Sequence, residues 1–124
     1  MDLQERLYSV LLVSAAENFN IALTALLPEA LYSPLHIVSS VSAAKRAIYE
    51  RSFDYVIINA PLADEFGTRF AIDTCHTQGT IVLLLVKSEL HAEIHDKVVK
   101  YGVFTLPKPI SKTTVALALN WMAS

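Results

Sequence analysis

The sequence predicts an α/β fold in which five parallel strands form one doubly wound sheet with helices on both faces. Five short apolar runs alternate with segments of helical periodicity along the chain, and the clearest runs are continuously apolar. Continuous apolar runs are typical of parallel strands buried on both faces. Parallel crossovers are right-handed, so we expect helices to cover both faces of the sheet. At 124 residues the chain is long enough for one domain, 1–124, with a substantial core.

The first two strand and helix units follow each other closely. Residues 9–13 read SVLLV, the pattern of a buried strand, and helical spacing follows over residues 16–27. A weaker second strand is expected at residues 35–38. Ser42 is then expected to cap a helix over residues 43–51, because a serine oxygen can accept an orphan amide hydrogen at a helix start.

The third and fourth units are the most apolar. A strand is expected at residues 55–58 and a helix at 68–78, followed by the strongest strand, residues 80–86. Ser88 is expected to cap the next helix, residues 89–101.

The last unit begins after Gly102, which has the position of a helix C-cap. A fifth strand is expected at residues 103–106, and the proline-rich residues 107–109 are expected to form a rigid turn. Ser111 is expected to cap a final helix that runs toward Met122.

Composition excludes several classes of protein. The chain is 53% hydrophobic and 18% charged, so it is not disordered, and its net charge of −2 argues against a strongly basic nucleic-acid surface or DNA binding by this domain. The longest apolar run, residues 81–86, is too short to cross a bilayer, and we expect no membrane span or signal peptide. A single cysteine, Cys75, permits no internal disulfide and favours a cytoplasmic location.

Several chemistries lack their motifs. Three isolated glycines give neither GxGxxG nor a P-loop, and neither CxxC nor GxSxG occurs. His91 and His95 are spaced as two ligands on one helix face, but Glu93 lies about 200° around the helix from His91, unlike the glutamate of HExxH. We expect a solvated helix face here, with a weak two-histidine metal site as the alternative.

Candidate site residues are expected at the carboxyl ends of the strands, where sites lie in parallel sheets. They fall in residues 14–17, 59–64 and 87–88 and at Lys108. Asn59 ends the third strand with an amide, which is neither a nucleophile nor a good ligand for a hard cation.

With these strands placed, residues 8–122 resemble a response-regulator receiver domain. The most specific features are the loop after the third strand, which ends at Gly67 eight residues past Asn59, and the pair Lys108–Pro109. The resemblance implies a flavodoxin-like sheet with strand order 2-1-3-4-5. It also implies a site in which two acids hold Mg²⁺, an aspartate takes a phosphoryl group, and a hydroxyl and a lysine bind its oxygens.

Matched residue by residue, this chain keeps only the lysine, Lys108. The acidic pair falls on Ser14 and Ala15, the phosphoacceptor on Asn59, and the hydroxyl on Lys87, with Ser88 one place later. The loop residues are Pro61, Asp64 and Gly67, and a switch aromatic of the fifth strand falls near Thr105. The resemblance therefore implies a pseudo-receiver that is not an enzyme, with no phosphotransfer, no metal and no cofactor.

Lys87 and Lys108 make the expected pocket, formed by the residues that match the receiver's phosphorylation site, formally positive. Two like charges a few ångströms apart repel by about 4 kcal/mol at an effective dielectric of 20. We expect Lys87 to turn to solvent. The alternatives are that Asp64 or Glu65 leans into the pocket, or that a small anion binds between the two lysines.

The phrases INAPLADEFG, LLLVKSE and GVFTLPKPIS resemble the degenerate receivers of ANTAR-type transcription antitermination regulators. The resemblance implies an RNA-binding helical module after the receiver, so we expect this chain to be a fragment. In the last helix Leu117 and Trp121 form a second apolar stripe, which is expected to be a homodimer face unless both stripes merge into one core face.

The main prediction is thus a non-phosphorylatable regulatory and dimerisation domain that acts in antitermination through an RNA-binding module outside this chain. Two alternatives stay open. The domain could be a stand-alone sensor that binds an acidic ligand at Lys87 and Lys108, or a receiver that is phosphorylated on an unusual acid such as Asp64.

Overall fold

The computed structural model describes residues 7–76, 79–111 and 113–115 and contains one five-stranded parallel sheet. Its strand order is β2-β1-β3-β4-β5, which confirms the predicted fold class and order. The strands are β1 (Tyr8–Val13), β2 (Tyr32–Val38), β3 (Tyr55–Asn59), β4 (Ile81–Lys87) and β5 (Phe104–Lys108). Each predicted strand lies within three residues of its observed bounds.

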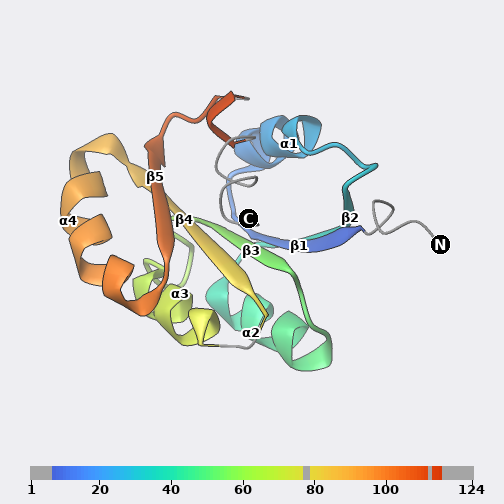
Figure 1. Ribbon diagram of the computed structural model, residues 1–124, viewed down its shortest axis with the longest axis horizontal. Coiled ribbons are helices and arrows are strands. Elements are labelled where there is room, and N and C mark those ends of the chain that lie inside the picture. Colours follow the sequence, from blue (N-terminus) through green and yellow to red (C-terminus); the bar gives the residue numbers. More distant parts are fainter. Residues whose placement is uncertain (1–6, 77–78, 112, 116–124) are drawn as a thin grey trace.

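Helices cover both faces of the sheet (Figure 1). They are α1 (Glu17–Leu26), α2 (Val41–Glu50), α3 (Thr68–Cys75) and α4 (Ser88–Val98), with a 3₁₀ turn η2 (Val99–Tyr101) after α4. Buried side chains of α2, α3 and α4 share one core cluster, and those of α1 share a second cluster with Val115. Among the described residues, no helix is long and apolar enough to cross a membrane.

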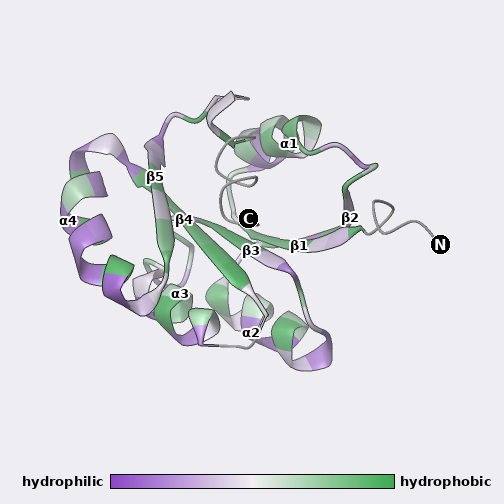
Figure 2. Cartoon of the chain, in the orientation of Figure 1, coloured by the Kyte–Doolittle hydropathy of each residue, from purple (hydrophilic) through white to green (hydrophobic). Residues whose placement is uncertain are grey.

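The strand β3 shows why the strand runs are continuously apolar. All five of its residues are buried, and successive side chains enter opposite core clusters, Val56 and Ile58 on one face and Tyr55 and Ile57 on the other. Strand centres are accordingly hydrophobic and the outer surface of α4 is largely hydrophilic (Figure 2). This burial places Asn59 at the end of a strand that is enclosed on both sides.

Two predicted helix caps are wrong. Ser40, not Ser42, caps α2, and its Oγ accepts from the Ala43 amide at 3.1 Å. Ser42 lies in the first turn, where its Oγ accepts from Arg46 Nη1 at 3.2 Å. Ser88 is the first residue of α4 and makes no capping bond. The predicted Ser111 cap is confirmed, because its Oγ accepts from the Thr114 amide at 3.2 Å.

The predicted turn at residues 107–109 is also wrong in part. Strand β5 continues through Pro107 and Lys108, which lie in register with Val86 and Lys87 of β4. Proline is tolerated there because β5 is an edge strand of the sheet. Leu117 and Trp121 lie outside the described residues.

Candidate functional site

The carboxyl ends of β1, β3 and β5 bring three candidate residues into contact. Ser14 directly follows β1 and is 1% exposed, and Asn59 ends β3 and is 6% exposed. Lys108 ends β5 and is half-buried. The sequence predicted this convergence from the strand-end rule alone.

A continuous set of hydrogen bonds joins these residues. Lys108 Nζ donates to Asn59 Oδ1 and to the Ala60 carbonyl, both at 2.7 Å. Asn59 Nδ2 donates to Ser14 Oγ at 3.1 Å, and that oxygen also accepts from the Ala16 amide at 3.2 Å. We call Ser14, Asn59, Ala60 and Lys108 the Asn59 network.

The two ends of the Asn59 amide have different partners. Its oxygen faces a cation and its nitrogen faces a hydroxyl oxygen, so the amide must lie in one orientation. Asn20 Nδ2 donates to the Ser14 carbonyl at 3.1 Å, which ties α1 to the same end of the sheet. Both ends of the Asn59 amide are therefore satisfied within the chain, the oxygen by Lys108 and the nitrogen by Ser14.

The two lysines have different surroundings although they are paired in register. Lys87 is exposed, as predicted, whereas burial and the nearby Lys87 charge lower the pKa of Lys108. Among the described residues, Lys108 is held by the amide and carbonyl oxygens and not by a carboxylate. The repulsion is therefore eased by exposure of one lysine and by hydrogen bonding of the other.

Asp64 lies at the N-terminus of α2 and not in the Asn59 network. Its two carboxylate oxygens accept from the amides of Val41 at 3.0 Å and Ser42 at 3.1 Å. These backbone hydrogen bonds lower the pKa of Asp64. Both oxygens serve to close the start of a helix, an arrangement that suits an anion.

The remaining candidates surround the network without joining it. Ala15 and Pro61 are exposed, and Ser88 Oγ donates to Glu89 Oε1 at 3.0 Å. Gly67 caps α3 with φ +113°, and a Cβ there would lie 3.2 Å from Ile58 Cγ2. Gly67 is therefore required for the turn that leads away from the site, because side chains rarely adopt that conformation.

The donor set does not fit the magnesium ion that the receiver resemblance implies for such a site. Mg²⁺ takes anionic oxygen ligands. Here the pocket offers an amide, a hydroxyl and an ammonium group, and the ammonium already occupies Asn59 Oδ1. Within the described residues there is also no group of three His, Cys, Asp or Glu side chains that could hold a metal.

The sequence analysis missed a second polar cluster. His91 and His95 were assigned to a solvated face, yet both are half-buried and both contact the Thr105 hydroxyl of β5. The spacing of the histidines signalled a shared face, but nothing in the sequence signalled that Thr105 would lie beneath it.

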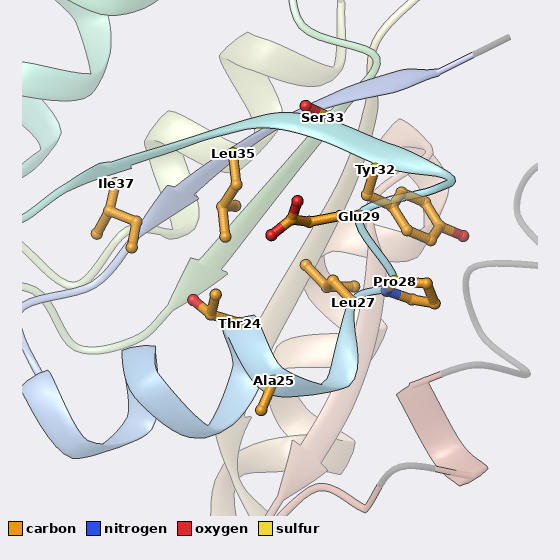
Figure 3. Close-up of a pocket in the computed structure, with 9 residues that line it drawn as sticks. All are labelled: Thr24, Ala25, Leu27, Pro28, Glu29, Tyr32, Ser33, Leu35 and Ile37. Carbon is orange, nitrogen blue, oxygen red and sulfur yellow. The ribbon is translucent and has the colours of Figure 1, made fainter.

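A separate cavity of about 640 Å³ lies between the end of α1 and β2. Figure 3 shows the Glu29 carboxylate among the apolar side chains of Leu27, Leu35 and Ile37. None of the candidate residues from the sequence lines it.

Comparison with known proteins identifies the fold. No protein-family model matches the sequence, and no curated protein is similar to it. Solved receiver domains are similar in structure over nearly the whole chain. The signal receiver domain of an HD domain-containing protein from Pseudomonas fluorescens has a TM-score of 0.81 at 24% identity, covering 98% of this chain and 90% of that one.

Two further structures support the same conclusion. A chemotaxis response regulator of Vibrio cholerae has a TM-score of 0.80 at 18% identity, covering 94% of this chain and 99% of that one. The receiver domain of a sensor histidine kinase from Pseudomonas aeruginosa has a TM-score of 0.77 at 17% identity, covering 96% of this chain and 100% of that one. That structure has a magnesium ion in its active site cleft. The chain therefore has the receiver fold.

Proposed function

We propose that this chain is a pseudo-receiver, a regulatory domain with the receiver fold that does not take up a phosphoryl group and is not an enzyme. The observation that supports this most directly is the 2.7 Å hydrogen bond from Lys108 Nζ to Asn59 Oδ1. A carboxylate can attack phosphorus, and an amide oxygen cannot do so usefully. The lysine that would bind a phosphoryl oxygen is already bonded to the amide.

The Asn59 network also favours a single arrangement of the strand ends, as the proposal requires. It joins residues after β1, β3 and β5, which are distant in sequence. A ligand shifts a conformational equilibrium only through different affinities for the two states. Because this site has neither the nucleophile nor the metal ligands, we infer that signals reach the domain through a bound partner.

The experiment is exposure to acetyl phosphate and Mg²⁺ followed by intact-mass measurement, with a phosphorylatable receiver domain in the same tube. We expect the control to gain a phosphoryl group and this chain to gain none. A gain that is lost in Asp64→Ala would replace the proposal with phosphorylation of Asp64. A gain that persists in Asp64→Ala would refute the proposal and leave the acceptor to be mapped.

The resemblance to ANTAR-type regulators supports a more specific role. We infer that the domain forms a homodimer in the cytoplasm and controls transcription antitermination through an RNA-binding helical module encoded after residue 124. Sedimentation should give a dimer for the wild-type chain and a monomer for Leu117→Ala/Trp121→Ala. Reading the source gene past codon 124 tests the module, and a stop codon there would remove the RNA-binding part of the proposal.

The paired lysines favour a second candidate, a sensor of small anions. Lys108 Nζ has three N–H groups and only two acceptors are described, so one donor is left for an anion beside the exposed Lys87. Titration with sulfate, followed by the ¹³Cε–¹Hε NMR signals of the lysines, tests it. Saturable shifts at Lys108 that vanish in Lys87→Ala would favour the anion sensor, and their absence would exclude it.

A further inference from the structure

The cavity between the end of α1 and β2 contains a single charged group. Of the nine described residues that line it, Glu29 alone has a side chain that is charged at neutral pH. Burial raises the pKa of the Tyr32 phenol, so this lining residue stays neutral. Figure 3 shows the Glu29 carboxylate beside the apolar side chains of Leu27 and Leu35. The cavity is therefore an apolar hollow with one negative charge.

The Glu29 carboxylate has no partner among the described residues. The ion pairs of the described chain lie within α3 and α4, and no hydrogen bond from a described residue reaches Glu29. Glu29 is also exposed to solvent, so a ligand can reach its carboxylate without any rearrangement of the chain. A cationic group placed there would gain charge-assisted hydrogen bonds, which are stronger than neutral ones.

The end of α1 adds negative character at the same place. The last turn of α1, which ends at Leu26, contains no basic side chain. The carbonyl groups at a helix C-terminus carry partial negative charge, so a cation is favourable there. Thr24 of this turn lines the cavity, and its hydroxyl already donates to the Asn20 carbonyl at 2.7 Å. Toward a ligand, the Thr24 oxygen can therefore only accept a hydrogen bond.

Tyr32 contributes an aromatic ring to the lining of the cavity, next to Glu29 (Figure 3). Its ring packs in a cluster with the rings of Tyr8 and Tyr55, at centroid distances of 6.2 Å and 5.9 Å. A cation is attracted to the face of an aromatic ring. The carboxylate, the helix end and the aromatic ring therefore favour the same class of ligand, and none of the three favours an anion.

We infer that this cavity binds a small organic cation, an ammonium or guanidinium group on an apolar body, through the Glu29 carboxylate. Leu35 and Ile37 of β2 contact the apolar body, and Ile37 is 44% exposed, so the ligand removes apolar surface from water. The volume of about 640 Å³ lies within the range of about 300–1,000 Å³ that is usual for small-molecule sites. No residue of the Asn59 network lines the cavity, so the site goes beyond the proposed function and does not rest on it.

Titration with 2-phenylethylamine, followed by methyl NMR, tests the site. We expect saturable shifts of the Leu35 and Ile37 signals. 2-Phenylethanol has nearly the same shape without the charge, and it should bind at least about tenfold more weakly. Glu29→Gln should weaken amine binding by a similar factor and leave binding of the alcohol unchanged. Glu50→Gln removes an equal charge from the exposed end of α2 and should leave amine binding unchanged. Circular dichroism of both variants checks that they are folded.

Several outcomes would overturn the inference. They are the absence of saturable amine binding, equal binding of amine and alcohol, unchanged amine binding in Glu29→Gln, and shifts confined to residues outside the cavity. The blocked tripeptide Ala-Arg-Ala tests the rival occupant, an arginine side chain of a partner protein. Tighter binding of this peptide than of the amine would assign the cavity to that partner. None of these readouts involves phosphorylation, so failure here is distinguishable from failure of the proposed function.

Discussion

Removal of the Ser14 hydroxyl should destabilise the domain more than its small size suggests. In Ser14→Ala, the Asn59 Nδ2 and Ala16 amide donors both lose the oxygen that they share. Ser14 and Asn59 are 1% and 6% exposed, so water has little access to replace that oxygen. A lost hydrogen bond costs about 1 kcal/mol, and a buried unsatisfied donor costs about 1–3 kcal/mol. We therefore expect the free energy of unfolding to fall by about 2–3 kcal/mol.

The assay is equilibrium unfolding in urea at pH 7, followed by circular dichroism. Ser88→Ala is the control, because its exposed hydroxyl contacts only the neighbouring Glu89 side chain among the described residues. Exposed substitutions of this kind usually change stability by less than about 0.5 kcal/mol. If Ser14→Ala were as mild as Ser88→Ala, the Asn59 network would not contribute to stability and the reasoning would fail.

A double-mutant cycle then tests whether the network acts as a unit. Ser14 and Lys108 do not bond each other, but both bond Asn59. Residues within one hydrogen-bond network show coupling energies of about 0.5–3 kcal/mol. Ser14→Ala and Lys108→Met should therefore be non-additive by at least about 0.5 kcal/mol, and strict additivity would show that the amide does not link them.

Three further predictions concern the surrounding elements. Backbone hydrogen bonds lower the pKa of Asp64 in the folded chain below its unfolded value, which is near 3.8. They therefore stabilise the fold fully above pH 3.8, and this stabilisation is lost as the pH falls through the folded pKa. Asp64→Ala should make the urea midpoint less sensitive to acid. Lys87→Ala should raise the pKa of Lys108 by removing a neighbouring positive charge, as followed by lysine ¹³Cε–¹Hε NMR. Ser40→Ala should cost about 1 kcal/mol in urea unfolding, and Ser42→Ala should cost clearly less, because of the two serine hydroxyls that of Ser40 accepts from a backbone amide and that of Ser42 accepts from the Arg46 side chain.

The fold could be predicted from the sequence because each buried strand of a parallel sheet is a short, continuous apolar run. Tyr55 to Ile58 form a continuous apolar run, and burial on both faces of the sheet is the reason. The extension of β5 through Pro107 could not be predicted in the same way. Whether a proline can stay in a strand depends on whether that strand is at an edge, which is a property of the whole sheet.

The start of α2 shows the same limit for helix caps. Ser40 and Ser42 are equally good capping residues by type, and the sequence offers no local reason to choose between them. In the structure, the carboxylate of Asp64 reaches across from the loop after β3 and accepts from the Val41 and Ser42 amides. A contact between residues more than twenty positions apart thus fixes the boundary.

The candidate site was predictable in position but not in connectivity. The strand-end rule placed Ser14, Asn59 and Lys108 together, since parallel strands end at one edge. The partners of Asp64 and the meeting of His91 and His95 at Thr105 were not predictable, because each depends on how a loop or helix packs onto the sheet.

The change from a carboxylate to an amide at Asn59 alters how the site must be stabilised. A cluster of carboxylates repels itself and needs a cation to be stable. In the Asn59 network, the amide oxygen accepts from Lys108 and the amide nitrogen donates to Ser14, so each end of the amide has a partner of the right kind. Such a site holds together without a metal ion, and it offers no carboxylate to accept a phosphoryl group. Under the proposed function, control must then act through a bound partner and not through phosphorylation of Asn59.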